Sequence, residues 1–164
     1  MRVLKDHRGF SLIEIMIVAG IVGILAAISL RMVGHIKYYN IEKTAQYVSD
    51  ALNKQQMKSM SKENKPLLYI YEYGGSFYYC LTETAATDPS ALGTKGKEIG
   101  IGVTIQFDNG GVKKTVEGGQ MLCIEFKRDG SFKECPDYIL ISNDSVSKKI
   151  RFNKLTGKHV ISTE

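Results

Sequence analysis

The chain has 164 residues, 43% of them hydrophobic, and a formal net charge of +5 at pH 7. This length leaves room for one modest hydrophobic core and argues against several independent domains. The charge alone does not predict a nucleic-acid binder, and nucleic acid is a possible but unfavoured partner. The small basic groups at residues 113–114 and 148–151 could contact DNA or anionic polymers, but we interpret them as solvated surface.

An apolar segment at residues 10–30 is the strongest signal in the sequence. Its 21 residues contain a single charged side chain, Glu14. A run of this length can cross a bilayer as a helix. A carboxylate at the centre of such a span costs roughly 2.5–3.5 kcal/mol, and somewhat less near an end. Glu14 therefore needs a partner or a function.

The residues around this carboxylate resemble a known leader signature. The run from Gly9 to Glu14, Gly-Phe-Ser-Leu-Ile-Glu, is similar to the N-terminal signature of type IV pilins and their pseudopilin relatives. The resemblance implies that a prepilin peptidase cleaves between Gly9 and Phe10 and that the new N-terminus at Phe10 is methylated. It also implies that Glu14 pairs with the terminal amine of a neighbouring subunit during filament assembly. Such a partner would remove much of the penalty of a carboxylate in lipid.

Two alternatives explain parts of the same segment. Residues 15–28 are uncharged and follow a basic N-terminus, and residues 27–29 could form a small-residue cleavage site, which is typical of a secretory signal peptide. An ordinary signal anchor would explain the length of the run. It would explain neither the pair Gly9 and Phe10 nor Glu14, whereas the pilin-like interpretation accounts for both.

The charges before the segment predict its orientation. Three basic residues, Arg2, Lys5 and Arg8, outweigh a single acidic residue in the first nine positions. We therefore expect a cytoplasmic N-terminus and an outside domain after Arg31. The resemblance implies a single-pass inner-membrane protein that later joins a cell-surface or periplasmic filament. Its implied partners are the lipid bilayer, the prepilin peptidase, an inner-membrane assembly platform and other pilin or pseudopilin subunits.

Small residues recur on one face of this expected helix. Ala19, Gly23 and Ala27 lie four residues apart, which allows another helix to approach closely. The spacing is expected if the N-terminal helices bundle. Small residues are also common in membrane helices of every kind, so this pattern alone does not require a bundle.

The helix is expected to continue past the apolar segment, because no proline occurs before Pro66. Its apolar positions then follow the spacing i, i+4, i+7 and i+11, at Ile41, Ala45, Val48 and Leu52. This spacing predicts an amphipathic helix that packs on the following domain. From Phe10 to about residue 62, the helix would extend roughly 80 Å. Many major pilins have a proline where this chain has Arg31, which favours a minor pilin or pseudopilin.

After Pro66 the pattern changes to short aromatic and β-branched runs separated by turn residues, which predicts an antiparallel domain of about six or seven strands. The expected strands are at residues 67–73, 77–81, 99–107, 121–126, 138–142 and 149–152, with a loop at 82–97. The predicted fold class is α+β: a long N-terminal helix packed on an antiparallel β-sheet head. The expected division is a leader at 1–9, a transmembrane or filament-core helix at 10–30, an amphipathic helix at 31–62 and the head at 63–164.

The C-terminal strands carry a second, weaker resemblance. The runs at residues 123–135, 138–142 and 150–157 are similar to the C-terminal region of the GspH/FimT group of minor pseudopilins. The resemblance rests on an apolar strand with an Asp-Gly hairpin, followed by two strands ending in Thr-Gly. We use it only to choose a subclass.

The register of that hairpin follows from its side chains. A two-residue turn would mix apolar and charged residues on both faces of the hairpin. A three-residue loop at 128–130 instead pairs Phe126 with Phe132, and Glu125 with Lys133. We predict this second register.

A disulfide is the consequence of this register. It would set Cys123 opposite Cys135, at a Cα separation of about 4.5–5.5 Å that a disulfide can bridge. We therefore predict a disulfide between Cys123 and Cys135, with Cys80 free. The alternative is three reduced thiols, since an odd number of cysteines is unusual in an exported domain.

No catalytic or metal site is predicted. The three histidines, His7, His35 and His159, are isolated, and no cluster has metal-ligand spacing. Residues 93–98 imitate a phosphate-binding loop but lack its spacing. We therefore expect no enzymatic activity, no cofactor and no metal.

Two hypotheses follow for the function. The favoured one is a structural subunit, minor rather than major, of a type IV pilus or a type II secretion-like pseudopilus. The alternative is a membrane-anchored or secreted β-sheet module that binds a ligand without polymerising, and an exported enzyme is the least favoured. Substitution of Glu14 distinguishes the first two, because only a filament subunit needs its carboxylate for assembly.

Overall fold

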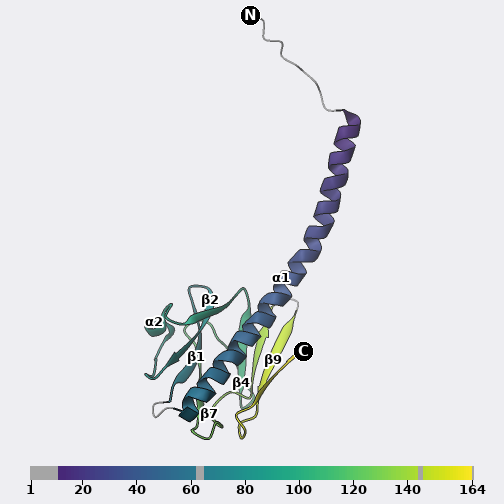
Figure 1. The fold of residues 1–164 in the computed structure, drawn as a ribbon. Helices are drawn as coiled ribbons and strands as arrows, with labels where there is room; N and C mark the ends of the chain where they lie inside the picture. The colour runs from purple at the N-terminus through teal and green to yellow at the C-terminus, as the bar shows by residue number, and fades with distance from the viewer. Residues whose placement is uncertain (1–10, 62–64, 144–145, 164) are drawn as a thin grey trace, which may run out of the picture. The chain divides into compact units, whose positions relative to one another are not determined.

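The computed structural model describes residues 11–61, 65–143 and 146–163, without the side chains of residues 27–38. The chain divides into two compact units, Met1–Ile36 and Lys37–Glu164 (Figure 1). One helix, α1 (Leu12–Ser61), contributes residues to both units. In the described part of the chain, no helix was found to be long and apolar enough to cross a membrane.

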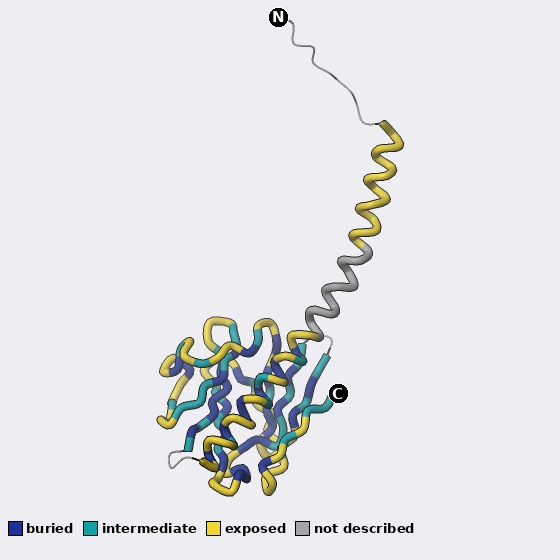
Figure 2. Tube along the Cα trace, in the orientation of Figure 1, coloured by how far each residue is buried: buried dark blue, intermediate teal, exposed yellow. Residues whose placement is uncertain are grey.

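The described side chains of the first unit are exposed. All residues from Ser11 to Ala26 are exposed, as Figure 2 shows along this part of α1. They include large hydrophobic side chains from Leu12, which is 78% exposed, to Leu25, which is 58% exposed. Among the described residues of this unit, no side chain buries this apolar part of the helix.

The second unit contains two antiparallel sheets of five strands each, so the expected single sheet is wrong. The first sheet has the order β3-β2-β1-β6-β7, and the second has the order β10-β9-β8-β4-β5. Strands of the first sheet are β1 (Leu67–Tyr73), β2 (Ser76–Thr82), β3 (Lys97–Ile101), β6 (Met121–Phe126) and β7 (Phe132–Glu134). Strands of the second are β4 (Thr104–Asn109), β5 (Val112–Thr115), β8 (Tyr138–Ser142), β9 (Ser147–Phe152) and β10 (His159–Thr163).

One predicted strand is divided between the two sheets. The run expected as a single strand at 99–107 forms the end of β3 and most of β4, in different sheets. Gly102 lies between them with a φ of +67°, in the left-handed region that favours glycine. The chain therefore leaves the first sheet at this glycine and starts the second.

The main core lies between α1 and the two sheets. The helical residues predicted to face the domain are at most 1% exposed, which confirms that face: Ile41, Ala45, Val48 and Leu52. They share one cluster with Leu68 and Ile124 of the first sheet and Ile139 of the second. Strands β6 and β8 bury alternate residues, as expected for strands with one face on this core.

A loop covers part of the other face of the first sheet, around β1. It contains the short helix α2 (Pro89–Leu92), in a segment predicted to have no regular structure. The hydroxyl of Tyr71 donates to the carbonyl of Gly93 at 3.0 Å, and the hydroxyl of Tyr69 accepts from the amide of Ala86 at 3.2 Å. Leu92 packs with both tyrosines in a second, smaller cluster. The second face of this sheet is therefore also buried where β1 lies.

The hairpin of β6 and β7 follows the prediction in part. Phe126 pairs with Phe132, as expected, with ring centroids 4.3 Å apart. Glu125 pairs with Glu134 rather than Lys133, because an irregularity in the pairing shifts the register by one residue. The side chains of Lys133 and Glu125 still meet in a salt bridge of 2.9 Å.

The same shift separates the cysteines that were predicted to pair. All three cysteines are free thiols in the structure. Cys135 is buried in the main core, whereas Cys123 packs in the smaller cluster on the opposite face of the sheet. Cys123 lies beside Tyr69 of β1 instead. A one-residue change of register moves a side chain to the other face, so the geometry that favoured a disulfide is absent.

Candidate functional site

The predicted processing site lies outside the described residues. Gly9 and Phe10 precede the first described residue, Ser11. Cleavage after Gly9 and methylation of Phe10 therefore stay predictions from the sequence. Glu14, the predicted assembly residue, lies in the first turn of α1.

Glu14 has a local partner in the structure. The backbone amide of Ser11 donates to Oε2 of Glu14 at 3.3 Å, and the amide of Ile15 donates to the carbonyl of Ser11 at 3.2 Å. A glutamate that reaches back to the amide three residues earlier is half of a capping box. The positive end of the helix dipole favours a carboxylate at the same place. Sequence reasoning missed this role, although the Ser-x-x-Glu pattern was visible.

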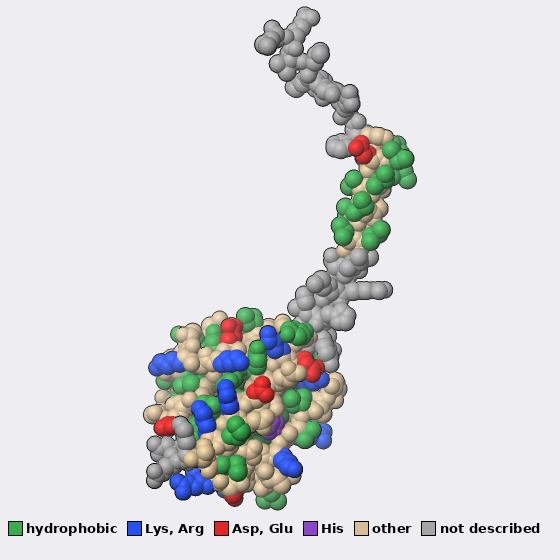
Figure 3. Space-filling model, in the orientation of Figure 1, with side chains coloured by type: hydrophobic (Ala, Val, Ile, Leu, Met, Phe, Trp, Pro, Cys, Tyr) green, Lys and Arg blue, Asp and Glu red, His purple; other side chains and the backbone are tan. Residues whose placement is uncertain are grey.

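The face of α1 next to this carboxylate is an apolar groove. It has a volume of about 390 Å³ and is lined by Glu14, Ile15, Val18, Ala19 and Val22. These positions recur every three to four residues, so they share one side of the helix. Figure 3 shows hydrophobic side chains gathered along this part of the chain. The groove thus combines one carboxylate with a wide apolar surface.

The small residues of this helix leave space beside it. A Cβ atom added at Gly20 or Gly23 would have no neighbour within 4 Å. Ala19 lines the groove, and the side chain of Ala27 lies outside the described set. Close approach of another helix is therefore unobstructed at these glycines within the chain itself.

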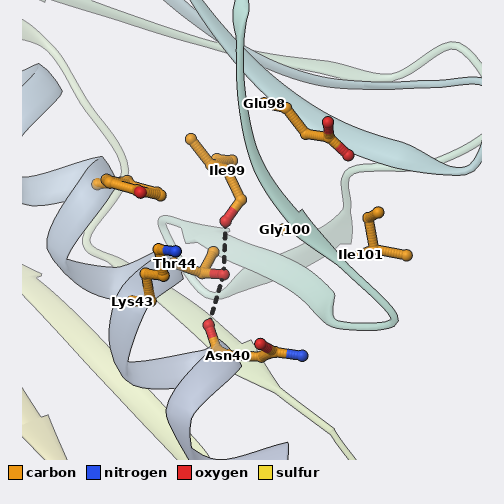
Figure 4. A pocket seen from close by; sticks show the side chains of 8 residues that line it. Asn40, Lys43, Thr44, Glu98, Ile99, Gly100 and Ile101 are labelled. Atoms are coloured by element: carbon orange, nitrogen blue, oxygen red, sulfur yellow. Dashed lines mark hydrogen bonds between the residues drawn. The ribbon is translucent and has the colours of Figure 1, made fainter. Parts of the chain in front are cut away.

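A second candidate site is a pocket in the second unit, between α1 and β3 (Figure 4). It has a volume of about 330 Å³. The hydroxyl of Thr44 lies 2.8 Å from the carbonyl oxygens of both Ile99 and Asn40. A Cβ atom added at Gly100 would lie 2.6 Å from Oγ1 of Thr44, so a glycine is needed where β3 meets the helix. The remaining lining residues are Lys43, Tyr47, Glu98 and Ile101.

Polar contacts along α1 hold the C-terminal strands. Nζ of Lys148 lies 3.0 Å from a carboxylate oxygen of Glu42, and Nε2 of His159 lies 2.7 Å from Oγ of Ser49. Nε2 of Gln56 donates to the carbonyl of Gly130 at 2.7 Å. The three helical residues lie seven positions apart, which places them on one side of α1. These contacts fasten the hairpin loops and the last strands to the helix, so we assign them a structural role.

The titratable groups of the head give no sign of a reactive centre. Burial lowers the pKa of His159. Burial also raises the pKa of Cys80, Cys123 and Cys135, in the last case to about 11. Their thiols are thus protonated at neutral pH, whereas a nucleophilic cysteine needs a low pKa. Within the described ranges, no three His, Cys, Asp or Glu side chains converge on a possible metal site.

Comparison with protein-family models matched residues 4–30 to the prokaryotic N-terminal methylation motif. The chain carries the prepilin leader signature of type IV pilins and pseudopilins. Comparisons with curated proteins and with solved structures gave no significant match. The prepilin motif spans Gly9, Phe10 and Glu14, which sequence analysis had selected.

The prepilin motif has several implications for the chain. It implies processing by a prepilin peptidase, membrane anchoring and assembly with other pilin subunits into a filament. Pilin-like proteins that carry this motif are structural subunits, not enzymes. The second similarity, to the GspH/FimT group, received no match in these comparisons.

Proposed function

We propose that the protein is a structural subunit, minor rather than major, of a type IV pilus or a type II secretion-like pseudopilus. The match of residues 4–30 to the methylation motif carries this proposal. In this proposal residues 1–9 are the leader, residues 10–30 anchor the chain and later enter the filament core, and residues 31–62 carry the head. Arg31, in place of the proline of many major pilins, supports a minor subunit.

The exposed apolar part of α1 supports assembly through the N-terminal helix. Between Leu12 and Leu25 the large hydrophobic side chains are 52–78% exposed. An apolar surface of this extent is unfavourable in water and marks a contact with lipid or protein. We propose that the bilayer covers it first, with the N-terminus cytoplasmic and the head outside. Helices of neighbouring subunits then replace the lipid in a cell-surface or periplasmic filament.

Glu14 would change its partner during this assembly. In the single chain its carboxylate accepts one long hydrogen bond, 3.3 Å, from the neutral amide of Ser11. The α-ammonium of Phe10 on a neighbouring subunit is a better donor, because charge-assisted hydrogen bonds are shorter and about twice as strong as neutral ones. The groove beside Glu14 offers the apolar surface on which the incoming helix would pack.

The first experiment determines the N-terminus of the processed chain. The protein would be co-expressed with a prepilin peptidase and recovered from membranes for intact mass and N-terminal sequencing. We expect a chain that begins at methylated Phe10. A start near Leu30 would indicate a secreted domain, and an intact Met1 would indicate an ordinary anchor. Either result would contradict the filament proposal.

The second experiment separates the charge of Glu14 from its capping role. Glutamine can also occupy the third position of a capping box, so Glu14→Gln keeps the cap and removes the charge, while Glu14→Ala removes both. We expect both variants to be processed normally and to be absent from filaments. The matched control is Glu117→Gln, an exposed carboxylate of the head, which should assemble normally. Normal incorporation of both Glu14 variants would contradict the assembly role assigned to Glu14.

A further inference from the structure

We propose that the last strand of the head, β10, pairs with β10 of a second copy of this chain and joins the second sheets of the two copies into one. The two β10 strands would be antiparallel and related by a two-fold axis. Such a pair is closed, because both copies use the same surface for the contact. The inference therefore goes beyond the proposed function and concerns the chain outside a filament.

The two sheets have four edge strands among the described residues, and three of them carry features that oppose pairing with another chain. The pairing of β3 with β2 is irregular, and the hydroxyl of Thr44 in α1 donates to the carbonyl of Ile99 in β3 at 2.8 Å. β7 has only three residues, two of them charged, and the amide of Phe132 donates to the carbonyl of Lys154 at 3.2 Å. β5 carries two exposed lysines. Irregular pairing, short length and charged side chains are the usual protections of a sheet edge.

The fourth edge strand, β10, has none of these features. Its five residues include no proline, lysine, arginine, aspartate or glutamate. They pair with β9 without a break, from His159 opposite Phe152 to Thr163 opposite Lys148. Among the described residues, the backbone of β10 has no hydrogen-bond partner outside β9. Figure 1 shows it beside the C-terminus, at one flank of the head. The outer amides and carbonyls of such an edge can pair with another strand.

The side chains of β10 favour its own copy as the partner. Ile161 pairs with Ile150, which pairs with Ile139, so three isoleucines form one row across the sheet. Ile139 and Ile150 are fully buried, whereas Ile161 at the edge is only partly buried against the same core. If Ile161 lies opposite Ile161 of the second copy, the row continues through both sheets. Side-chain pairs of this kind stabilise neighbouring strands.

This register also pairs the whole strand. With Ile161 opposite its copy, all five residues of β10 face a residue of the other strand, and every other register leaves some of them unpaired. Val160, which is 65% exposed, then lies opposite Ser162. His159 lies opposite Thr163. No like charges meet in these pairs, so the register has no electrostatic penalty.

The other edge of the same sheet, β5, is a poorer partner for β10. Its Lys114 pairs with Phe107, which pairs with Ile139. This lysine therefore stands at the end of the apolar row opposite to Ile161. A sheet that continued from β10 into β5 of another copy would bring an ammonium group beside the apolar row. Pairing of two β10 strands brings none.

The size of the contact predicts its strength. Two strands of five residues bury less surface than the roughly 1,600 Å² of a standard stable interface. We therefore expect a weak dimer, whose population rises with protein concentration. A method that traps the dimer covalently is suited to a contact of this kind.

Disulfide cross-linking of the full chain in detergent tests the register. Val160→Cys and Ser162→Cys, on chains with different affinity tags, would be mixed under mild oxidation, and mass spectrometry would identify the linked peptides. Cα atoms of directly opposite residues are about 4.5–5.5 Å apart, within the range of a disulfide, whereas diagonal neighbours are about 7–8 Å apart. We therefore expect the mixture to form the disulfide between positions 160 and 162. Each variant alone should form little disulfide with itself.

A lysine in place of Ile161 should prevent the pairing. Ile161→Lys, introduced into both cysteine variants, would place two ammonium groups opposite each other and should lower the yield of the disulfide about tenfold. The matched control is Val112→Lys on β5, at an apolar side chain 57% exposed, which should leave the yield unchanged. Because Ile161 also contacts the core, circular dichroism would check the fold of its variant. The two cysteine variants test the register even if Ile161→Lys does not fold.

Three results would overturn the inference. The first is a mixture that yields no more cross-linked dimer than the unmodified chain, whose three free thiols set the background. The second is equal linking of each variant with itself, which would mean that no fixed register exists. The third is linking of Ser162→Cys to Lys113→Cys, which would assign the partner edge to β5. None of these results depends on cleavage after Gly9, so the proposed function is tested separately.

Discussion

The two ends of α1 differ in how far their apolar side chains are buried. Near its start, every described side chain from Ser11 to Ala26 is exposed, although most are apolar. In the head, the apolar side of the helix is almost completely buried, with Val48 and Leu52 at 0% exposure. The head half buries its apolar face in the core that it shares with the two sheets. The apolar side chains of the other half are not covered by any described residue.

The polar residues of the two halves differ in the same sense. Among the described residues, Glu14 has only a local contact, to the amide of Ser11. Glu42, Ser49 and Gln56 contact residues more than 70 positions away in sequence, through Lys148, His159 and Gly130. Contacts between residues far apart in sequence form when the head folds. A carboxylate with only a local partner remains available to another molecule, which is the basis of the proposed assembly.

The largest expected difference in stability is between two substitutions by alanine on the same helix. Leu52→Ala should destabilise the head by about 2–5 kcal/mol, because it removes a fully buried side chain and leaves a cavity. Ile17→Ala, at a side chain 57% exposed, should change the unfolding free energy of the head by less than about 0.5 kcal/mol. Urea denaturation in detergent, followed by circular dichroism, measures both. A large effect of Ile17→Ala would mean that the first half also packs within the chain.

A pair of glycine substitutions should change stability in opposite directions. A Cβ atom at Gly157 would collide with the carbonyl oxygen of Gly130, and its φ is +69°. Gly157→Ala should therefore cost about 1–3 kcal/mol. Gly23→Ala meets no neighbour within 4 Å and should favour the helix by about 1 kcal/mol. Urea unfolding measures the expected loss of stability in Gly157→Ala, and circular dichroism measures the expected gain of helix in Gly23→Ala. A change in the same direction in both variants would contradict the prediction.

Sequence reasoning succeeded where one periodicity dominated. The bounds of β6 (Met121–Phe126) and β8 (Tyr138–Ser142) match the expected ranges, because alternate residues of each strand face the core. The buried face of α1 followed from a spacing of three and four residues for the same reason. Such patterns depend only on neighbours in the sequence. Glu14 lies within the motif matched at residues 4–30, and its role in assembly stays a prediction.

Features that depend on distant residues were not predictable in this way. The expected strand at 99–107 is divided at Gly102 because its two halves pair with strands of different sheets. The shifted register of β6 and β7 moved Cys135 away from Cys123, and no local pattern signals such an irregularity. His159 was considered isolated, yet its partner Ser49 lies 110 positions away. The α1–β3 pocket likewise combines residues that no motif connects.

The stability of the head should depend on pH through one of these distant pairs. Burial lowers the pKa of His159 below 6.5 in the folded state. As pH falls below about 6.5, the unfolded chain binds a proton that the folded head does not, so stability is lost until the folded pKa is reached. One such group changes the unfolding free energy by at most about 1.4 kcal/mol per pH unit.

The variant His159→Gln checks this assignment. It should remove most of the dependence on pH between 6.5 and the folded pKa of His159. Carboxylates such as Asp137, whose pKa is lowered from 3.8 by its hydrogen bond with Lys154, act only in more acidic solution. Denaturation midpoints at a series of pH values provide the measurement. An unchanged slope in His159→Gln would assign the effect to another group.

The smallest expected effect tests how firmly β3 is held to the helix. The hydroxyl of Thr44 donates to the carbonyl of Ile99, and the residue is 1% exposed. Thr44→Val keeps the shape but removes the donor, so it should cost about 0.5–1.5 kcal/mol, the net value of one hydrogen bond. Thr44→Ser keeps the hydroxyl and serves as the control, with a smaller loss from its missing methyl group. If Thr44→Val were as stable as the unmodified chain, apolar packing alone would hold β3. The head half of α1 would then be held by burial of apolar side chains alone. In the proposed function, the first half reaches the same burial in lipid or against other subunits.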